Sequence, residues 1–307
     1  MKPVRIFLLL ASIVPLLATA GITSDGLPGG AIWYLHADLA QMRNSKSGGP
    51  LYQWFNDEVI VEINDEFGVR LDDEVDSVTA FSAENMGTVI VVEGPLSQGF
   101  RDQMLQAIRN ETSVKEGRSE GKKYYFARDE ENSLQRGDDP FDDFEDAVFF
   151  SFDVNKKLIV TSHEEQMKAM LKSGGKITGG GSVDRAMFVL TADRSFVQAG
   201  LRPDGMTDDG DDDWESNIIR NTEQAAVLVS DSDGQIAVEA RLISADPKMA
   251  QSIGGIVNGL ISLQAFNTDL DPQLLGLIQN TRIGVNENML SISTVVDPQL
   301  VINLFSD

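Results

Sequence analysis

The chain of 307 residues contains no cysteine and only two histidines. Without a thiol, it can form no disulfide, use no cysteine nucleophile and carry no lipid on a lipobox cysteine. Two histidines cannot build a histidine-rich metal site. His36 lies in a strand pattern and His163 follows a candidate helix-capping serine, and neither stands in a motif with a serine and an acid. We therefore expect neither histidine to be catalytic.

Motifs for phosphate binding are also missing, since the chain has no G-x-x-x-x-G-K-[ST] loop and no G-x-G-x-x-G turn. The letters G-x-S-x-G occur once, at residues 117–121, in a charged stretch without the apolar strand and helix that a nucleophile elbow needs. Two matches to S-x-x-K, at residues 119–122 and 173–176, lie in polar or glycine-rich stretches rather than at the start of an apolar helix. We expect no catalytic and no cofactor-binding residue.

Basic residues are scarce relative to acids. The chain has 25 Lys and Arg against 48 Asp and Glu, a formal net charge of −23. Such a charge repels nucleic acid and anionic lipid head groups, so we expect no nucleic-acid partner, whereas cations or a basic surface would be attracted. The hydrophobic content of 42% is that of an ordinary globular protein, and the length suggests two domains.

The N-terminus has the pattern of an export signal. Lys2 and Arg5 precede an uncharged apolar run over residues 6–20, which is shorter than a bilayer-spanning helix needs. The small-x-small sequence that ends at Ala20 predicts a signal peptide over residues 1–20 and a soluble periplasmic or secreted protein, with no integral membrane segment after cleavage. An uncleaved anchor is the alternative. Cleavage leaves 23 basic against 48 acidic residues, a net charge of −25.

Four hairpin-then-helix units recur along the rest of the chain. Each has two β-rich runs around a short polar turn, and the Asp-Gly turn at 233–234 is of the kind that hairpins favour. The paired runs are 75–82 with 88–93, 147–152 with 157–161, 225–229 with 235–243, and 281–285 with 289–296. The helical patterns that accompany them are 97–109, 163–172, 249–266 and 297–305.

A strand and a helix precede each pair of units. They are predicted at 31–39 and 49–67 in the first half, and at 186–193 and 194–201 in the second. Both halves therefore read β-α-ββα-ββα. We predict an α+β fold with a first domain over 21–172, a glycine-rich linker over 173–185 and a second domain over 186–307. We expect two tandem antiparallel sheets, each with helices on one face in ferredoxin-like layering.

Helix starts carry capping residues. Asp-Pro pairs at 246–247, 271–272 and 297–298 place a side-chain oxygen at the N-cap and a proline at the first helical position. Ser162 and Glu165 have the spacing of a capping box.

Two acidic segments, 128–146 and 202–216, interrupt the pattern and are predicted to be surface insertions. The second offers weak candidates for calcium ligands, which are Asp208, Asp209, Asp211, Asp212 and Asp213. An EF-hand alignment with Gly210 or Gly234 at its sixth position fails at the first and last positions, so calcium is an alternative rather than the expectation.

Residues 249–266 are uncharged and contain a G-x-x-x-G spacing at 255–259. Gln251, Asn258 and Ser262 fall on one helical stripe, and apolar residues that include Ile253 and Leu260 fall on another. This segregation predicts an amphipathic helix that covers a sheet rather than a membrane span.

The run Ala31-Ile-Trp-Tyr-Leu-His-Ala-Asp38 and the hairpin-helix segment from Leu158 to Leu171 resemble a diffuse group of exported bacterial proteins of unknown function. The resemblance covers most of the mature chain as a pattern and implies no site residue.

We expect a non-catalytic binding or interaction protein of the bacterial cell envelope, with an envelope protein or a glycan as partner. The alternatives are a hydrolase that uses two carboxylates and a cation-binding protein that uses the acidic insertions. An oligomeric state does not follow from the sequence.

The export signal makes a first prediction. The mature protein should begin at Gly21, because the small-x-small cleavage sequence ends one residue earlier. Intact-mass measurement of protein recovered from the periplasm or the medium checks this, and a mass that retains residues 1–20 would contradict a soluble exported form.

Overall fold

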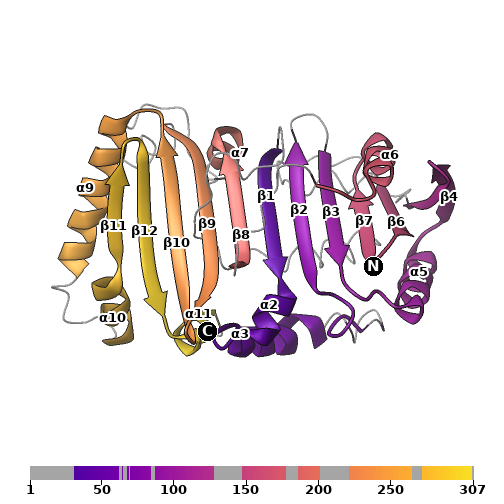
Figure 1. Cartoon of the computed structure of the whole chain (residues 1–307), viewed down its shortest axis with the longest axis horizontal. Coiled ribbons are helices and arrows are strands. Elements are labelled where there is room, and N and C mark those ends of the chain that lie inside the picture. The colour runs from indigo at the N-terminus through magenta and orange to yellow at the C-terminus, as the bar shows by residue number, and fades with distance from the viewer. Residues whose placement is uncertain are drawn as a thin grey trace.

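One antiparallel sheet of twelve strands runs the length of the molecule, in the order β11-β12-β10-β9-β8-β1-β2-β3-β7-β6-β5-β4 (Figure 1). This computed structural model describes residues 31–61, 64, 68, 70–83, 87–127, 147–177, 186–200, 221–264 and 272–305. The predicted signal peptide, both acidic insertions and Asp271 lie outside the described residues. The fold is mixed helix and strand, so the predicted α+β class is confirmed.

The bounds of the predicted hairpins agree with the structure to within a few residues, whereas the helix predicted over 49–67 is shorter and ends in a π-helical turn, and the short helix Leu39–Asn44 was not predicted. In the first half the strands are β1 (Ala31–Asp38), β2 (Ser77–Ala83), β3 (Gly87–Glu93), β4 (Val114–Ser119), β5 (Lys122–Ala127), β6 (Val148–Val154) and β7 (Lys157–Thr161). The helices there are α2 (Leu39–Asn44), α3 (Gly48–Phe55), the π-helical turn η2 (Asn56–Ile60), α5 (Gln98–Glu111) and α6 (Glu164–Ser173). The second half has β8 (Ala186–Asp193), β9 (Thr222–Ser232), β10 (Gln235–Ser244), β11 (Arg282–Asn286), β12 (Met289–Val296), α7 (Arg194–Gly200), α9 (Pro247–Gln264), α10 (Pro272–Asn280) and α11 (Pro298–Phe305).

The expectation of two separate sheets is wrong, because the first strands of the two halves pair with each other. β1 and β8 run antiparallel, with Leu35 opposite Leu190, and this pair joins the halves into one sheet. From the join outwards the strands follow β1-β2-β3-β7-β6 on one side and β8-β9-β10-β12-β11 on the other. Separate sheets would each leave a long apolar first strand as an open edge, and pairing the two removes both edges.

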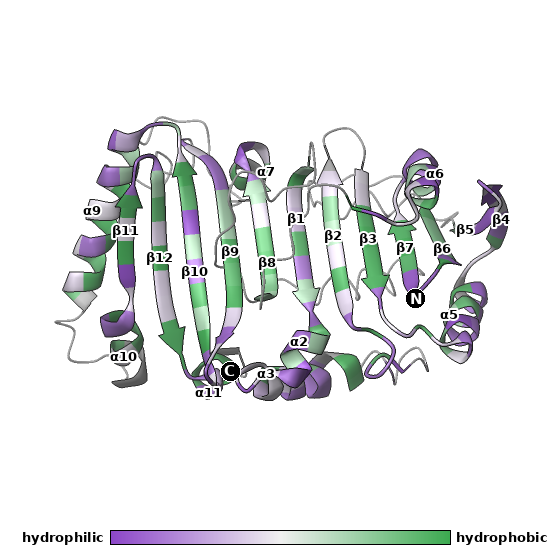
Figure 2. Cartoon of the chain, viewed as in Figure 1, coloured by the Kyte–Doolittle hydropathy of each residue, from purple (hydrophilic) through white to green (hydrophobic). Residues whose placement is uncertain are grey.

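The two faces of the sheet are distinguished by the side chains of β1. Side chains alternate along a strand and directly paired residues share a face, so we call the two sides the Trp33 face and the Tyr34 face. The main core lies on the Trp33 face, where Phe100, Met104 and Ile108 of α5 pack with strand residues such as Ile90. Figure 2 shows the apolar residues along the central strands.

The helix α6 lies on the opposite side from α5, so the expectation that helices cover one face only is wrong for the first half. Met167, Met170 and Leu171 of α6 pack with Val91 and Ile159 in a separate core cluster on the Tyr34 face. Val91 and Ile159 are directly paired across β3 and β7. Both faces of this part of the sheet are apolar and therefore need a cover.

Helices of each half also contact the other half. The ring of Phe196 in α7 lies 6.0 Å from that of Trp33 in β1, and α11 packs against α3. The carboxylate of Asp231, in the β9–β10 hairpin, accepts hydrogen bonds from the backbone N–H of Ser47 at 2.9 Å and from its hydroxyl at 2.6 Å. Ser47 is fully buried at the start of α3, so these two hydrogen bonds link the second half of the molecule to the first.

Two of the predicted helix caps are confirmed. Asp246 accepts hydrogen bonds from the N–H groups of Lys248 and Met249, and Asp297 accepts one from Gln299. The capping box at 162–165 is wrong. α6 has His163 at its N-cap without a side-chain cap, because the buried Ser162 hydroxyl instead accepts a bond from the N–H of Thr88.

The β4–β5 hairpin was not predicted. Its turn, Glu120-Gly121, has both residues at positive φ, at 53° and 78°, as a tight two-residue hairpin turn requires. The charged sequence around this turn was interpreted as a polar loop, and strands without regular apolar alternation give little other signal.

The uncharged segment at 249–266 forms α9, which packs against the sheet through residues such as Ala250 and Ile253. Gly254 allows a close approach, since a Cβ there would lie 2.7 Å from a methyl of Val285. Leu260 does not pack as predicted and is 44% exposed. Among the described helices, none is long and apolar enough to cross a membrane.

The contact between Asp231 and Ser47 makes a stability prediction. The substitution D231A should lower the free energy of unfolding by roughly 1–3 kcal/mol, because it leaves the buried Ser47 hydroxyl without its acceptor. The bonds from Ser47 lower the pKa of Asp231, so its contribution is present above the ordinary aspartate pKa and is lost as pH falls through the folded-state pKa. Urea unfolding at pH 7 and near pH 3 measures both effects. S232A, next along the hairpin, is the matched control and should change stability little.

Candidate functional site

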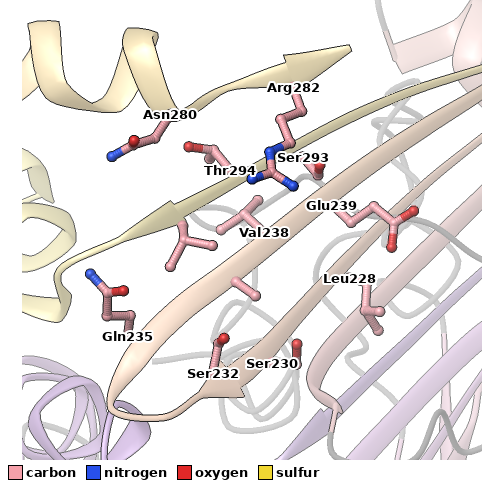
Figure 3. A pocket seen from close by; sticks show the side chains of 12 residues that line it. Leu228, Ser230, Ser232, Gln235, Val238, Glu239, Asn280, Arg282, Ser293 and Thr294 are labelled. Atoms are coloured by element: carbon pink, nitrogen blue, oxygen red, sulfur yellow. The ribbon is translucent and has the colours of Figure 1, made fainter. Parts of the chain in front are cut away.

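A depression of about 430 Å³ lies on the Tyr34 face of the second half, near the β9–β10 hairpin (Figure 3). It opens over four adjacent strands, β9, β10, β12 and β11. Its lining consists of Leu228, Ser230, Ser232, Gln235, Ala237, Val238, Glu239, Asn280, Arg282, Ser293, Thr294 and Val295.

Strand register explains why the surface is hollow there. One row of paired residues crosses the four strands as Arg282, Ser293, Glu239 and Leu228. The next row towards the hairpin has Ala237 in its centre, between Val295 and Ser230. The small side chains of Ser293, Ala237 and Ser230 lie among the longer ones of Arg282, Glu239 and Leu228, which leaves a concave surface.

The charged groups of the depression are partly paired. Glu239 accepts a hydrogen bond at 2.7 Å from the Nε of Arg241, two positions along β10 on the same face. Arg282 is exposed at the start of β11 and takes part in none of the ion pairs found among the described residues. The two charged side chains that line the depression, Glu239 and Arg282, have opposite signs, and Arg241 beside them adds one positive charge.

The remaining polar groups are hydroxyls and amides. Ser230, Ser232 and Ser293 supply hydroxyls, and Gln235 and Asn280 supply amides, whereas the Thr294 hydroxyl donates to the Leu277 carbonyl on the opposite face. Hydroxyls and amides both donate and accept hydrogen bonds, while the guanidinium of Arg282 only donates. The lining suits a ligand that presents several oxygen atoms, some as donors and some as acceptors.

His36 lies on the same face as the depression, and paired positions across β1, β8, β9 and β10 connect it through Val189 and Leu228 to Glu239. It is half-buried, as predicted, and its Nδ1 is 2.8 Å from the Thr79 hydroxyl. Burial lowers the pKa of His36, while Asp38 on β1 and Glu93 on β3 act in the opposite direction.

Tyr34 lies two residues before His36 and on the same face of β1. It is buried, and this burial together with the negative charge of Glu93 raises its pKa to about 12. Glu93 itself is ion-paired with Lys157. Neither His36 nor Tyr34 lines the depression.

The other residues considered from sequence do not form a site here. His163 is exposed at the start of α6, as predicted. The five weak calcium candidates at 208–213 lie outside the described residues. Within the described parts of the chain, no group of three or more histidine, aspartate or glutamate residues is placed to hold a metal ion.

Sequence reasoning missed every residue of the depression. The β10 run Gln235-Ile-Ala-Val-Glu-Ala-Arg241 was interpreted only as a strand, although its alternate positions read Gln, Ala, Glu and Arg. Polar and small residues at a period of two mark a face that is not part of the core. The sequence therefore indicated a polar face on β10, but it did not indicate which strands pair with β10 to form the depression.

The environment of His36 makes a pH prediction. Its folded-state pKa is lowered, so the unfolded chain binds more protons and the free energy of unfolding should fall as pH drops below about 6.5. Urea unfolding at pH 7.5 and 5.5 measures this loss, and H36Q should reduce it. H163Q is the matched control at an exposed histidine and should keep the wild-type dependence. An equal effect of both substitutions would contradict the assignment to His36.

Comparisons with known proteins place the chain only loosely. No family model and no curated protein sequence matches it. Among solved structures, crystal form IV of TP0453 is similar with a TM-score of 0.47 and 12% identity, over 91% of this chain and 94% of that one. Crystal forms III and I of TP0453 give TM-scores of 0.42 and 0.43 at 12% and 11% identity, over 93% and 94% of this chain and 98% of each of those. Similarity at this level assigns no function to the chain.

Proposed function

We propose that this protein is an exported, non-catalytic binding protein of the cell envelope, and that its ligand site is the depression over β9, β10, β12 and β11. The observation that carries the proposal is the lining itself, in which hydroxyl, amide and guanidinium groups surround a floor of small and apolar side chains. Concave sites with a few convergent polar groups are the usual places for ligand binding.

The ligand class that fits this lining is a hydroxyl-rich molecule such as a segment of a glycan. Neighbouring hydroxyls of a sugar both donate and accept, which matches Ser230, Ser293 and Gln235. Arg282 presents a planar fork of donors to two adjacent ligand oxygens. None of the described lining residues has an aromatic side chain for a sugar ring to stack on, so we expect modest affinity.

A hydrolase that uses two carboxylates is less well supported by this site. Such an enzyme needs an acid and a second carboxylate on either side of the scissile bond. Among the described residues that line the depression, Glu239 is the one carboxylate, and it accepts a hydrogen bond from Arg241. The acidic-insertion alternative concerns residues outside the described part of the chain and receives no support from the depression.

We also propose that the two halves are copies of one β-α-ββα-ββα unit. The support is the shared order of strands outward from the β1–β8 pair, with the β4–β5 hairpin as an addition to the first copy. Superposition of β1-β2-β3-β7-β6 on β8-β9-β10-β12-β11 in an experimental structure tests it.

The proposed site makes a binding prediction. R282A should weaken binding of a glycan ligand about tenfold to a hundredfold, because it removes a charged donor that faces the depression. Isothermal titration calorimetry of the mature protein against neutral and acidic envelope glycan fragments measures the loss. R118A removes an equally exposed arginine from β4 and should leave affinity unchanged.

Two results would overturn the proposal. One is wild-type protein that binds no hydroxyl-rich ligand at millimolar concentration. The other is binding that R118A and R282A reduce to the same extent, because this would indicate a general effect of charge. Hydrolysis of the glycan by the wild type, lost in E239Q, would favour the enzyme instead.

A further inference from the structure

The two ends of the sheet differ in how their edge strands are protected. β4 carries Lys115, Glu116 and Arg118 among its six residues. At the other end, β11 has a single charged residue, Arg282, and Gly284 stands at its centre. Figure 2 shows β4 as hydrophilic, while part of β11 is hydrophobic. Because charges on an edge strand oppose pairing with another chain, β11 is the unguarded edge.

Within their bounds the two elements at this edge, β11 and α9, contain no acid, and Glu287 stands in the turn that follows β11. α9 runs beside β11 (Figure 1), and neither Pro247–Gln264 nor Arg282–Asn286 includes an aspartate or glutamate. Apolar side chains are left open there, since Val285 is 39% exposed and Ile256 is 38% exposed. In a chain with 48 acids, most contacts between two copies would bring like charges together, whereas a contact at this edge would not.

The backbone of β11 has the arrangement that pairing with a second copy requires. The two-residue turn Glu287-Asn288 makes Asn286 and Met289 the closing pair of the β11–β12 hairpin. Backbone groups alternate in direction along a strand, so those of Gly284 point to β12 and those of Ile283 and Val285 point to the open edge.

A two-fold axis at Gly284 brings the outward groups of two β11 strands together. Ile283 then lies opposite the partner's Val285, and each pair can exchange two backbone hydrogen bonds. Gly284 of one copy then lies opposite Gly284 of the other, as a non-hydrogen-bonded pair, and in such pairs the two Cα atoms are about 4.5 Å apart. A glycine at this position leaves room for the approach. In this register Arg282 lies opposite the partner's Asn286, so no like charges are paired.

We propose that a second copy of this chain pairs with β11 through its own β11, giving a homodimer in which the sheet continues across the two-fold axis. The interface places the partner's Asn286 beside Arg282 at the rim of the depression, so each subunit would extend the rim of the other. The proposal rests on the edge alone and does not depend on the glycan ligand.

A single engineered cysteine tests the register, because the chain has no cysteine of its own. G284C should form a disulfide-linked dimer on mild oxidation, since a separation of about 4.5 Å lies within the range that a disulfide spans. A Cβ at this position would lie 2.9 Å from the Ser291 hydroxyl, which can rotate away. N286C is the control on the same strand, because its copy would lie roughly 14 Å away along the strands. K115C is the control at the β4 edge.

Cross-linking of G284C well above both controls supports the proposal. Equal cross-linking of all three variants, or none in G284C, overturns it.

Sedimentation velocity of the unmodified mature protein gives a second measurement that no substitution can disturb. We expect a monomer–dimer equilibrium that shifts towards dimer from low to physiological salt, because salt screens the repulsion between two acidic copies. A monomer at every concentration up to millimolar would also overturn the proposal. R282A should keep the cross-linking of G284C, which separates this test from that of the ligand site.

Discussion

The antiparallel pairing of β1 with β8 is the constraint on which the rest of the structure depends. Each of these strands is largely buried and apolar, and each would be an open edge if the halves were separate. Their pairing converts two half-sheets into one, and it sets the register of every row that crosses the join. The contacts of α7 with β1, and of Asp231 with Ser47, are consequences of that pairing.

The register also decides where polar groups gather. The row that passes through His36 on β1 continues through Val189 and Leu228 to Glu239 on β10. Its central members are apolar and its outer members are polar. The depression forms where the rows contain serine and alanine rather than larger residues. The site is therefore formed by two hairpins, β9–β10 and β11–β12, and no single element contains it.

The charge of the chain is unevenly distributed over its described elements. β4 at one end of the sheet has a cluster of paired charges, whereas β11 and α9 at the other end carry two basic residues and no acid. A uniform acidic surface would keep the chain soluble and would also repel most partners. An edge strand that contains no acid lies beside the depression, and the two features place the candidate binding surfaces at one end of the molecule.

Most of the local elements of this protein follow from short-range signals in its sequence. Turn residues, Asp-Pro helix starts and apolar periodicity predicted most strands and helices, because these signals act over a few residues. They could not predict that Ser162 would bond to Thr88 rather than cap α6, since that choice depends on a strand 74 positions away. Only the tertiary structure decided that the halves share one sheet, that α6 and α5 take opposite faces, and that Arg282, Ser293 and Glu239 meet in one row. Strand pairing joins residues far apart in the chain, and its free energy depends on which edges and faces are left for each strand to cover.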